Sequence, residues 1–321
     1  MLPGNSTIKE FEALIGKHCN KEHAIATCNA SVGILGVFHA LGLAGKEIIT
    51  APFTWPGAIS GLLMLNCKIK ICEAEGDFYN IDPEKLEDLI TIDTKAIFSS
   101  DFLGYPCRLD IISSICRKHN ILLIHDGASS FGSYYQQNQA GYYADVAVYS
   151  FGKRKLFSVG EGGAIITNNE EIYLSLLKSL THPERQNIES DCYNPFSLNT
   201  TINPLAAKYG LETYKEQLIR INERSKNVTG ILRKLLPCTK IKSAVPNYYK
   251  IILPRHFDDS IRKKHFTNYS YYSLARELRC FSVVNNILVP ENIAHKTEHT
   301  SLEEWRIIEF NEIAELQGII Q

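Results

Sequence analysis

Lys155 is the residue whose type and position indicate the most chemistry in this sequence. It lies in the stretch from Ser150 to Gly163, directly after Ala144–Tyr149, which is apolar enough to be a buried strand. A lysine amine just beyond such a strand can hold an aldehyde cofactor as a Schiff base, if desolvation or a cationic neighbour lowers its pKa. Lys153 and Arg154 are cationic neighbours in the sequence. A basic surface loop is the alternative interpretation, because lysines are mostly exposed.

Asp126 ends a second apolar run, Ile121–His125. An aspartate at the carboxyl end of a strand can pair with a cationic ring nitrogen and keep that nitrogen protonated. Gly127 and Ala128 follow, so an aspartate that merely caps a turn is the alternative.

The junction Thr27–Val32 has residues suited to phosphate binding. Free backbone N–H groups at the start of a helix bind anions, and the Ser31 hydroxyl would assist. A plain Asn or Ser helix cap is the alternative. Ser150 is a second hydroxyl for the same phosphate, and Asn199 is a further polar candidate.

Trp55 follows another predicted strand and can either lie flat against a planar ring or pack in the core. A phosphate turn, an aromatic side chain, a strand-end aspartate and a strand-end lysine, in this order on one fold, indicate a common site far more strongly than any of them singly.

Strand and helix patterns alternate from residue 24 to residue 179. Strands are predicted at 24–27, 47–50, 68–72, 95–99, 121–125, 144–149 and 163–167, and helices at 32–43, 56–65, 109–119 and 170–179. This alternation predicts an α/β fold with a mainly parallel sheet and helices on both faces. Ligands of such folds bind beyond the carboxyl ends of the strands.

The pattern changes near residue 204. Asn203 and Pro204 are typical of a helix start, and Leu205–Leu235 continues as one long helix or as two with a kink. The chain beyond Pro237 is less regular. We therefore expect a large cofactor-binding domain over 1–203, and a connecting helix with a smaller C-terminal α+β domain over 204–321.

Composition restricts the class of protein. The 321 residues carry a formal net charge of −1, which gives no reason to expect binding to nucleic acid or to an anionic membrane. The N-terminus has no signal-peptide pattern, and no apolar stretch approaches a membrane span. Nine cysteines without a CxxC pair indicate reduced thiols rather than disulfides or a zinc site. A metal-free cytoplasmic protein is expected.

The sequence resembles the fold-type I pyridoxal-phosphate enzymes, and more narrowly the DegT/StrS-type nucleotide-sugar aminotransferases. The resemblance runs from about Glu10 to Leu211. Its best stretches are NAS at 29–31, PFTW at 52–55, NIDPE at 80–84, TKAI at 94–97, DGA at 126–128 and the segment from Ser150 to Gly163.

The resemblance implies that pyridoxal phosphate is bound as a Schiff base to Lys155, paired through its pyridine nitrogen with Asp126 and stacked on Trp55. It implies further cofactor contacts from Ser31, the backbone of Val32, Ser129, Ser150 and Asn199. Asn199 would reach the cofactor of the other subunit of a homodimer with shared active sites. The implied reaction moves an amine from an amino acid, usually glutamate, to a keto sugar attached to a nucleotide.

Departures from the family pattern concern the substrate more than the cofactor. Ser129 stands where the family commonly has Gln, and Asp101 replaces a frequent His; an Arg near Thr201 and the sugar-facing His motif after Tyr249 are not found. A different pyridoxal-phosphate reaction on a non-sugar substrate (elimination, decarboxylation or condensation) and a non-catalytic cofactor-binding scaffold therefore stay open. The dehydratase branch has His in place of the Schiff-base Lys, so Lys155 argues against it.

Overall fold

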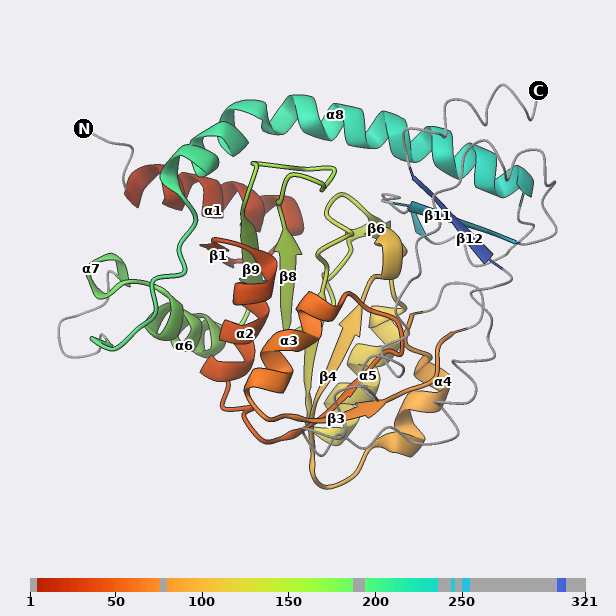
Figure 1. Ribbon diagram of the computed structural model, residues 1–321, viewed down its shortest axis with the longest axis horizontal. Helices are drawn as coiled ribbons and strands as arrows, with labels where there is room; N and C mark the ends of the chain where they lie inside the picture. The colour runs from red at the N-terminus through yellow and green to blue at the C-terminus, as the bar shows by residue number, and fades with distance from the viewer. Residues whose placement is uncertain are drawn as a thin grey trace.

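A seven-stranded sheet forms the centre of the protein (Figure 1). The computed structural model describes residues 5–75, 80–186, 194–235, 244–245, 250–254 and 305–309. The sheet has the order β1-β9-β8-β5-β4-β2-β3. Its strands are β1 (His23–Thr27), β2 (Glu47–Thr50), β3 (Lys68–Ile71), β4 (Thr94–Ser100), β5 (Leu122–Asp126), β8 (Val146–Ser150) and β9 (Gly163–Thr167).

The strands of this sheet are mainly parallel, as predicted. Pairing is parallel from β3 through β2, β4 and β5 to β8. Only β9 runs antiparallel to its neighbours within the sheet, β1 and β8. The carboxyl ends of β2, β4, β5 and β8 therefore lie at one edge, which is where the candidate residues follow their strands.

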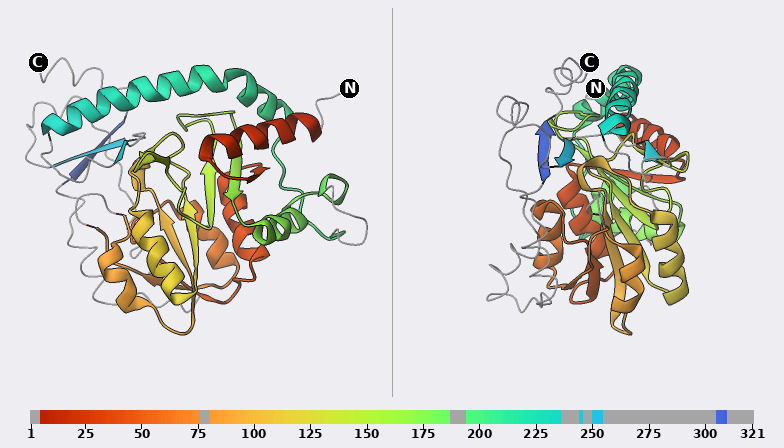
Figure 2. Two further views of the ribbon diagram at one scale, coloured as in Figure 1. Left: turned by 180° about the vertical axis from the view of Figure 1, so that it is seen from behind. Right: turned by 90° about the vertical axis from the view of Figure 1, so that its right-hand side faces the viewer.

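Helices cover both faces of the sheet (Figures 1 and 2). One face packs against α1 (Asn5–Cys19), α5 (Leu109–His119) and α8 (Pro204–Leu235), and the other against α2 (Ala30–Ala40), α3 (Pro56–Met64) and α6 (Glu170–Leu180). Alternate residues of a strand serve the two cores, as Ile97 and Phe98 of β4 do. Burial on both faces explains why the strands are continuous apolar runs in the sequence.

The long helix α8 is one element of 32 residues, so the kinked alternative is wrong. It lies along α1, and its Ala207 and Ile221 are buried in the core beneath (Figure 1). Beyond it, β10 (Ala244–Val245) pairs with β6 (Tyr134–Tyr135), and β11 (Lys250–Pro254) pairs with β12 (Trp305–Glu309). The division into domains 1–203 and 204–321 stays a prediction, since most of the chain after Leu235 lies outside the described residues.

Several elements are not predicted by the patterns above. The largest is α1, an amphipathic helix that buries Ile8, Phe11 and Ile15 against the sheet. The others are short, so periodicity has too few residues to reveal them: α4 (Pro83–Leu86), η2 (Glu87–Leu89), η3 (Phe102–Gly104), β6, β7 (Asn138–Gln139) and α7 (Pro183–Gln186).

Gly61 sets how closely α3 approaches α2. A Cβ atom on Gly61 would lie 2.9 Å from the Leu35 Cα atom and 3.2 Å from its backbone nitrogen. Alanine normally favours a helix over glycine by about 1 kcal/mol. Here we expect Gly61→Ala to lower the free energy of unfolding by about 1–3 kcal/mol, because the two helix backbones must separate. Chemical denaturation would measure this, with the exposed neighbour Ser60→Ala as the control. Stabilisation of Gly61→Ala would contradict this account.

Candidate functional site

Lys155 lies in the loop that joins β8 to β9, just beyond the carboxyl end of β8. Its Nζ donates a hydrogen bond to Ser129 Oγ at 3.2 Å, and its backbone N–H closes a turn on Gly152 O at 2.8 Å. The side chain is half-buried, whereas Lys153 and Arg154 are exposed. The interpretation as an exposed surface loop therefore fits Lys153 and Arg154. It does not fit Lys155, whose amine is held in its half-buried position by the hydrogen bond to Ser129.

Asp126 ends β5, and its carboxyl group is buried, with 6% of the residue exposed. Burial raises its pKa, while the Ala128 N–H and the positive charge of Lys155 lower it. The hydrogen bond from Ala128 N to Oδ1, at 2.9 Å, shows that Asp126 also fills the turn role named as its alternative. A buried carboxylate beside a lysine ammonium is thus brought to the same edge of the sheet.

The pairing of β1, β9 and β8 brings the start of α2 to the same end of the sheet. Ser150 of β8 pairs with Gly163 of β9, and Gly163 pairs with Thr27 of β1. A Cβ atom on Gly163 would lie 2.8 Å from Ala30 N and from Tyr149 O. Gly163, the last of the glycines after Lys155, is therefore required for the first turn of α2 to approach β8 and β9.

Asn29 caps α2, because its Oδ1 accepts the Val32 N–H at 2.9 Å. The predicted phosphate donor Val32 N is thus engaged by the cap, which is the alternative that the sequence left open. Ser31 is exposed. A Cβ atom on Gly57 would lie 3.0 Å from the Trp55 Nε1 atom and 3.2 Å from Ser31 Oγ, so both side chains border the space above this glycine.

Trp55 is 62% exposed, so the core-packing alternative is wrong. It precedes α3 and makes no side-chain cap bond. Two buried hydroxyls near the carboxyl ends of β2 and β4, Thr54 Oγ1 and Ser100 Oγ, have no hydrogen-bond partner in the described part of the chain. Leaving such groups unsatisfied costs about 1–3 kcal/mol each, so this edge has polar groups suited to a bound ligand.

Ser150 is positioned by strand β8, whereas Asn199 lies in an exposed segment before α8. Ser150 is half-buried at the end of β8, and its Oγ accepts the Gly152 N–H at 3.5 Å. Asn199 is exposed. Its neighbour Thr200 accepts the Cys28 N–H at 2.6 Å, which ties this segment to the end of β1.

The sequence patterns do not predict the buried network that lies beside Asp126. His125 Nε2 contacts Asp101 Oδ2 at 2.9 Å, His125 Nδ1 contacts Ser99 Oγ at 2.9 Å, and Asp101 N donates to Asp126 O at 3.2 Å. The sequence signal that could have indicated this network is a pair of polar residues, Asp101 and His125, at the ends of two strands.

Cys107 completes a set of three potential metal ligands with Asp101 and His125, whose ligand atoms lie within 4.8 Å of one another. Each of these groups already has a protein partner. The Cys107 N–H donates to Asp101 Oδ1 at 2.7 Å, and its thiol donates to Ser100 O at 3.0 Å. Burial raises the pKa of the Cys107 thiol. Hydrogen bonding accounts for this cluster as the scaffold behind Asp126.

Comparison with known proteins identifies the family. The model of the DegT/DnrJ/EryC1/StrS aminotransferase family matches residues 2–250. GDP-perosamine synthase of Caulobacter vibrioides is 32% identical over 166 residues, which cover 51% of this chain and 45% of that protein. The UDP-4-amino-4,6-dideoxy-N-acetyl-beta-L-altrosamine transaminase of Campylobacter jejuni is 28% identical over 221 residues, which cover 67% of this chain and 58% of that protein.

Solved structures share the fold. The E. coli GDP-4-keto-6-deoxy-D-mannose-3-dehydratase with bound hydrated PLP matches with a TM-score of 0.79 at 20% identity, covering 98% of this chain and 92% of that chain. The chain belongs to the DegT/DnrJ/EryC1/StrS aminotransferase family, and the predicted fold class is confirmed. It spans about half the length of the curated relatives it matches, 45% and 58% for these two.

We expect Asp101→Asn to lower the free energy of unfolding by about 1–3 kcal/mol, because the amide offers one acceptor atom where the carboxylate offers two, so the His125 and Cys107 contacts are both kept only in one ring tautomer. Equilibrium denaturation would measure the change. Asp88→Asn, at an exposed position, is the control and should stay within about 0.5 kcal/mol of the unsubstituted protein. Equal stability of the two variants would show that the buried network contributes little.

Proposed function

We propose that this protein is a pyridoxal-phosphate-dependent aminotransferase that moves an amine from an amino acid, glutamate in the first instance, to a keto sugar linked to a nucleotide. The observation that carries the proposal is the meeting of the Lys155 amine and the buried Asp126 carboxylate at the carboxyl edge of the sheet. Family membership and the names of the sugar-aminotransferase relatives support the same reaction.

The residues at this edge fit pyridoxal phosphate. In the described chain the Asp126 carboxylate accepts one hydrogen bond, at Oδ1, which leaves Oδ2 for a protonated ring nitrogen. The exposed Trp55 indole offers a flat apolar face, and the space above Gly57 lies between that indole and Ser31 Oγ. Ser31 and Ser150 are the hydroxyls suited to the phosphate, with Asn199 for the partner subunit's cofactor.

Each residue has a stated role in the proposed reaction. The cofactor, when bound, supplies an electron sink for the carbon that loses a proton. Asp126 keeps the ring nitrogen protonated, because its negative charge is buried beside it. Lys155 Nζ anchors the cofactor and afterwards moves the proton, with Ser129 Oγ orienting the amine. Trp55 fixes the plane of the ring.

The visible absorption spectrum tests this proposal. With pyridoxal phosphate, the protein should show the band of the lysine-bound cofactor, and glutamate should bleach it. Lys155→Ala should lack that band and lose at least a thousandfold in turnover, because both anchoring and proton transfer depend on one amine. Lys153→Ala, an exposed lysine of the same loop, is the control and should behave as the unsubstituted protein.

The outcomes separate the alternatives. A band that persists with glutamate indicates another donor or another pyridoxal-phosphate reaction, such as elimination or decarboxylation. Absence of any band with Lys155 intact would overturn the enzyme proposal in favour of a non-catalytic scaffold. Full turnover by Lys155→Ala would contradict the site assignment.

A homodimer with shared active sites is part of the proposal. Apolar side chains around Asn199 are exposed in the single chain, namely Phe196 (91%), Leu198 (50%), Leu205 (63%) and Tyr209 (51%). Exposed apolar surface of this kind is a recurrent mark of a protein–protein interface. Burying it against a second copy would bring Asn199 toward the partner's cofactor.

Mixed dimers test the sharing of sites. Lys155→Ala and Asn199→Ala should each be impaired alone. When they are co-refolded, we expect about a quarter of the unsubstituted activity, because half the dimers are mixed and each mixed dimer has one intact site. Activity no greater than the mean of the two separate variants would place Asn199 in its own subunit's site. Light scattering gives the oligomeric state independently.

We also propose that the protein works in the cytoplasm. In the described chain, Cys19, Cys28, Cys67, Cys72, Cys107 and Cys116 are all free, as expected where thiols stay reduced. None of the described helices has the length and apolar character needed to cross a membrane.

A further inference from the structure

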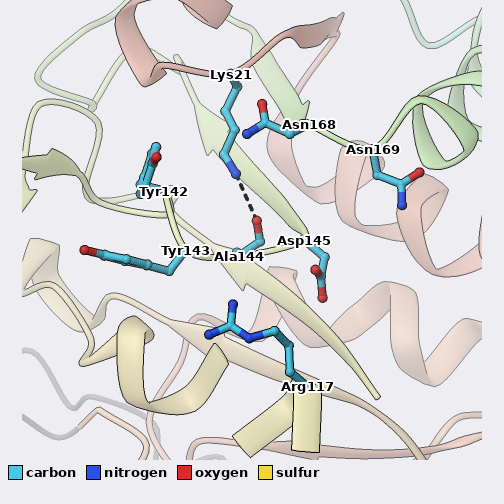
Figure 3. Close-up of a pocket in the computed structure, with 8 residues that line it drawn as sticks. All are labelled: Lys21, Arg117, Tyr142, Tyr143, Ala144, Asp145, Asn168 and Asn169. Atoms are coloured by element: carbon cyan, nitrogen blue, oxygen red, sulfur yellow. Dashed lines mark hydrogen bonds between the residues drawn. The ribbon is translucent and has the colours of Figure 1, made fainter. Parts of the chain in front are cut away.

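A cavity of about 380 Å³, whose lining residues are drawn in Figure 3, is formed at the amino ends of the strands. Lys155 and Asp126 lie at the opposite, carboxyl ends. The cavity is bordered by residues that immediately precede β1 and β8 and follow β9, together with the last turn of α5. These are the amino ends of the parallel strands. Since β8 has five residues, the cavity is separated from the Lys155 loop by about 16 Å of strand.

Two cations face this cavity. Lys21 Nζ donates to Ala144 O at 3.1 Å and lies 5.4 Å from the centre of the Tyr142 ring. Arg117 reaches from α5 toward the same backbone from the other side (Figure 3). Its guanidinium donates only to the hydroxyls of Ser113 and Ser114, at 3.1 and 3.3 Å, and has no ion pair in the described part of the chain.

In both asparagines of the cavity, the side-chain oxygen already accepts a hydrogen bond, whereas the side-chain nitrogen is available within the described part of the chain. Asn168 Oδ1 accepts the Glu22 N–H at 2.9 Å, and Asn169 Oδ1 accepts the Ile172 N–H at 3.0 Å as the cap of α6. Neither side-chain NH₂ group donates a hydrogen bond to a described residue. An ammonium group has three hydrogen-bond donors and a guanidinium group has five. Lys21 and Arg117 therefore also have N–H donors that the contacts above do not use.

Asp145 is the one carboxylate among the described residues that line the cavity. Its Oδ2 accepts the Leu123 N–H at 2.8 Å, so part of its accepting capacity is used by the backbone. Burial lowers the pKa of Lys21, and the charge of Asp145 opposes that shift. With two cations against one anion, the lining keeps a net positive charge and an excess of donors over acceptors.

We propose that this cavity binds a small anion rich in hydrogen-bond acceptors, namely a phosphate group, free or carried by a small molecule. Arg117 and Lys21 would supply the charge-assisted hydrogen bonds, and the Asn168 and Asn169 amides would supply neutral ones. The cavity is larger than a phosphate ion alone requires. Tyr142 and Tyr143, whose rings meet edge to face at 5.2 Å, form an aromatic wall for an organic group.

The test uses the full chain saturated with pyridoxal phosphate, so that the cofactor's own phosphate site is filled. The unfolding temperature is measured against increasing inorganic phosphate or phenyl phosphate at constant ionic strength. We expect a saturable rise for the unsubstituted protein. Arg117→Gln, at an exposed position, should weaken the apparent affinity at least tenfold.

Lys118→Gln is the matched control, because Lys118 is an exposed cation on the same helix that pairs with Glu87 and does not line the cavity. It should bind both probes as the unsubstituted protein does. Equal affinities for the two probes identify free phosphate as the ligand. Tighter binding of phenyl phosphate, lost in Tyr142→Ala, identifies a phosphate ester. No saturable rise, or the same affinity in Arg117→Gln and Lys118→Gln, would overturn the proposal, whatever the outcome for the proposed reaction.

Discussion

The burial of the Asp126 carboxylate is the constraint on which the rest of the site depends. A buried charge is tolerated only when it is paired or hydrogen-bonded. Here burial raises the pKa of Asp126, and the Ala128 N–H and the Lys155 charge offset that effect in part. Lys155 reaches this place because the loop after β8 turns back toward the end of β5, where Ser129 receives its amine. The carboxylate and the amine therefore stabilise each other in the arrangement that cofactor chemistry requires.

Close approach between backbone segments positions the remaining groups of the candidate site, Trp55 and Ser31. Gly163 lets the start of α2 lie against β8 and β9, and Gly61 lets α3 lie against α2. The space above Gly57 then falls between Trp55 and Ser31. Because protein interiors are closely packed, a side chain at Gly61 or Gly163 would displace a backbone rather than fill a void. Glycines of one helix, α3, and of one strand, β9, thus determine where the aromatic and hydroxyl groups stand.

The parallel arrangement of the strands also explains why their carboxyl ends and their amino ends carry different chemical groups. The carboxyl ends of the strands collect the groups suited to a cofactor, whereas the amino ends collect Lys21, Asp145 and the turn before α6. Antiparallel β9 connects the edges, since it begins beside Ser150 and ends beside the cavity. A ligand at the amino edge would therefore contact the segments that lead directly into the strands of the candidate site.

The sequence by itself determined the α/β class and the positions of the main strands, and it singled out Lys155, Asp126 and Trp55 as candidates, because strand-end residues and buried apolar runs are local patterns. It left open whether Asn29 caps α2 and whether Trp55 is buried, since both depend on neighbours distant in sequence. Only the tertiary structure decided that Ser129 receives the lysine amine, that Asp101 and His125 pair behind Asp126, and that Lys21 and Arg117 share a cavity. Register between strands and packing between helices set those contacts, and neither is encoded in the spacing of residues along one segment.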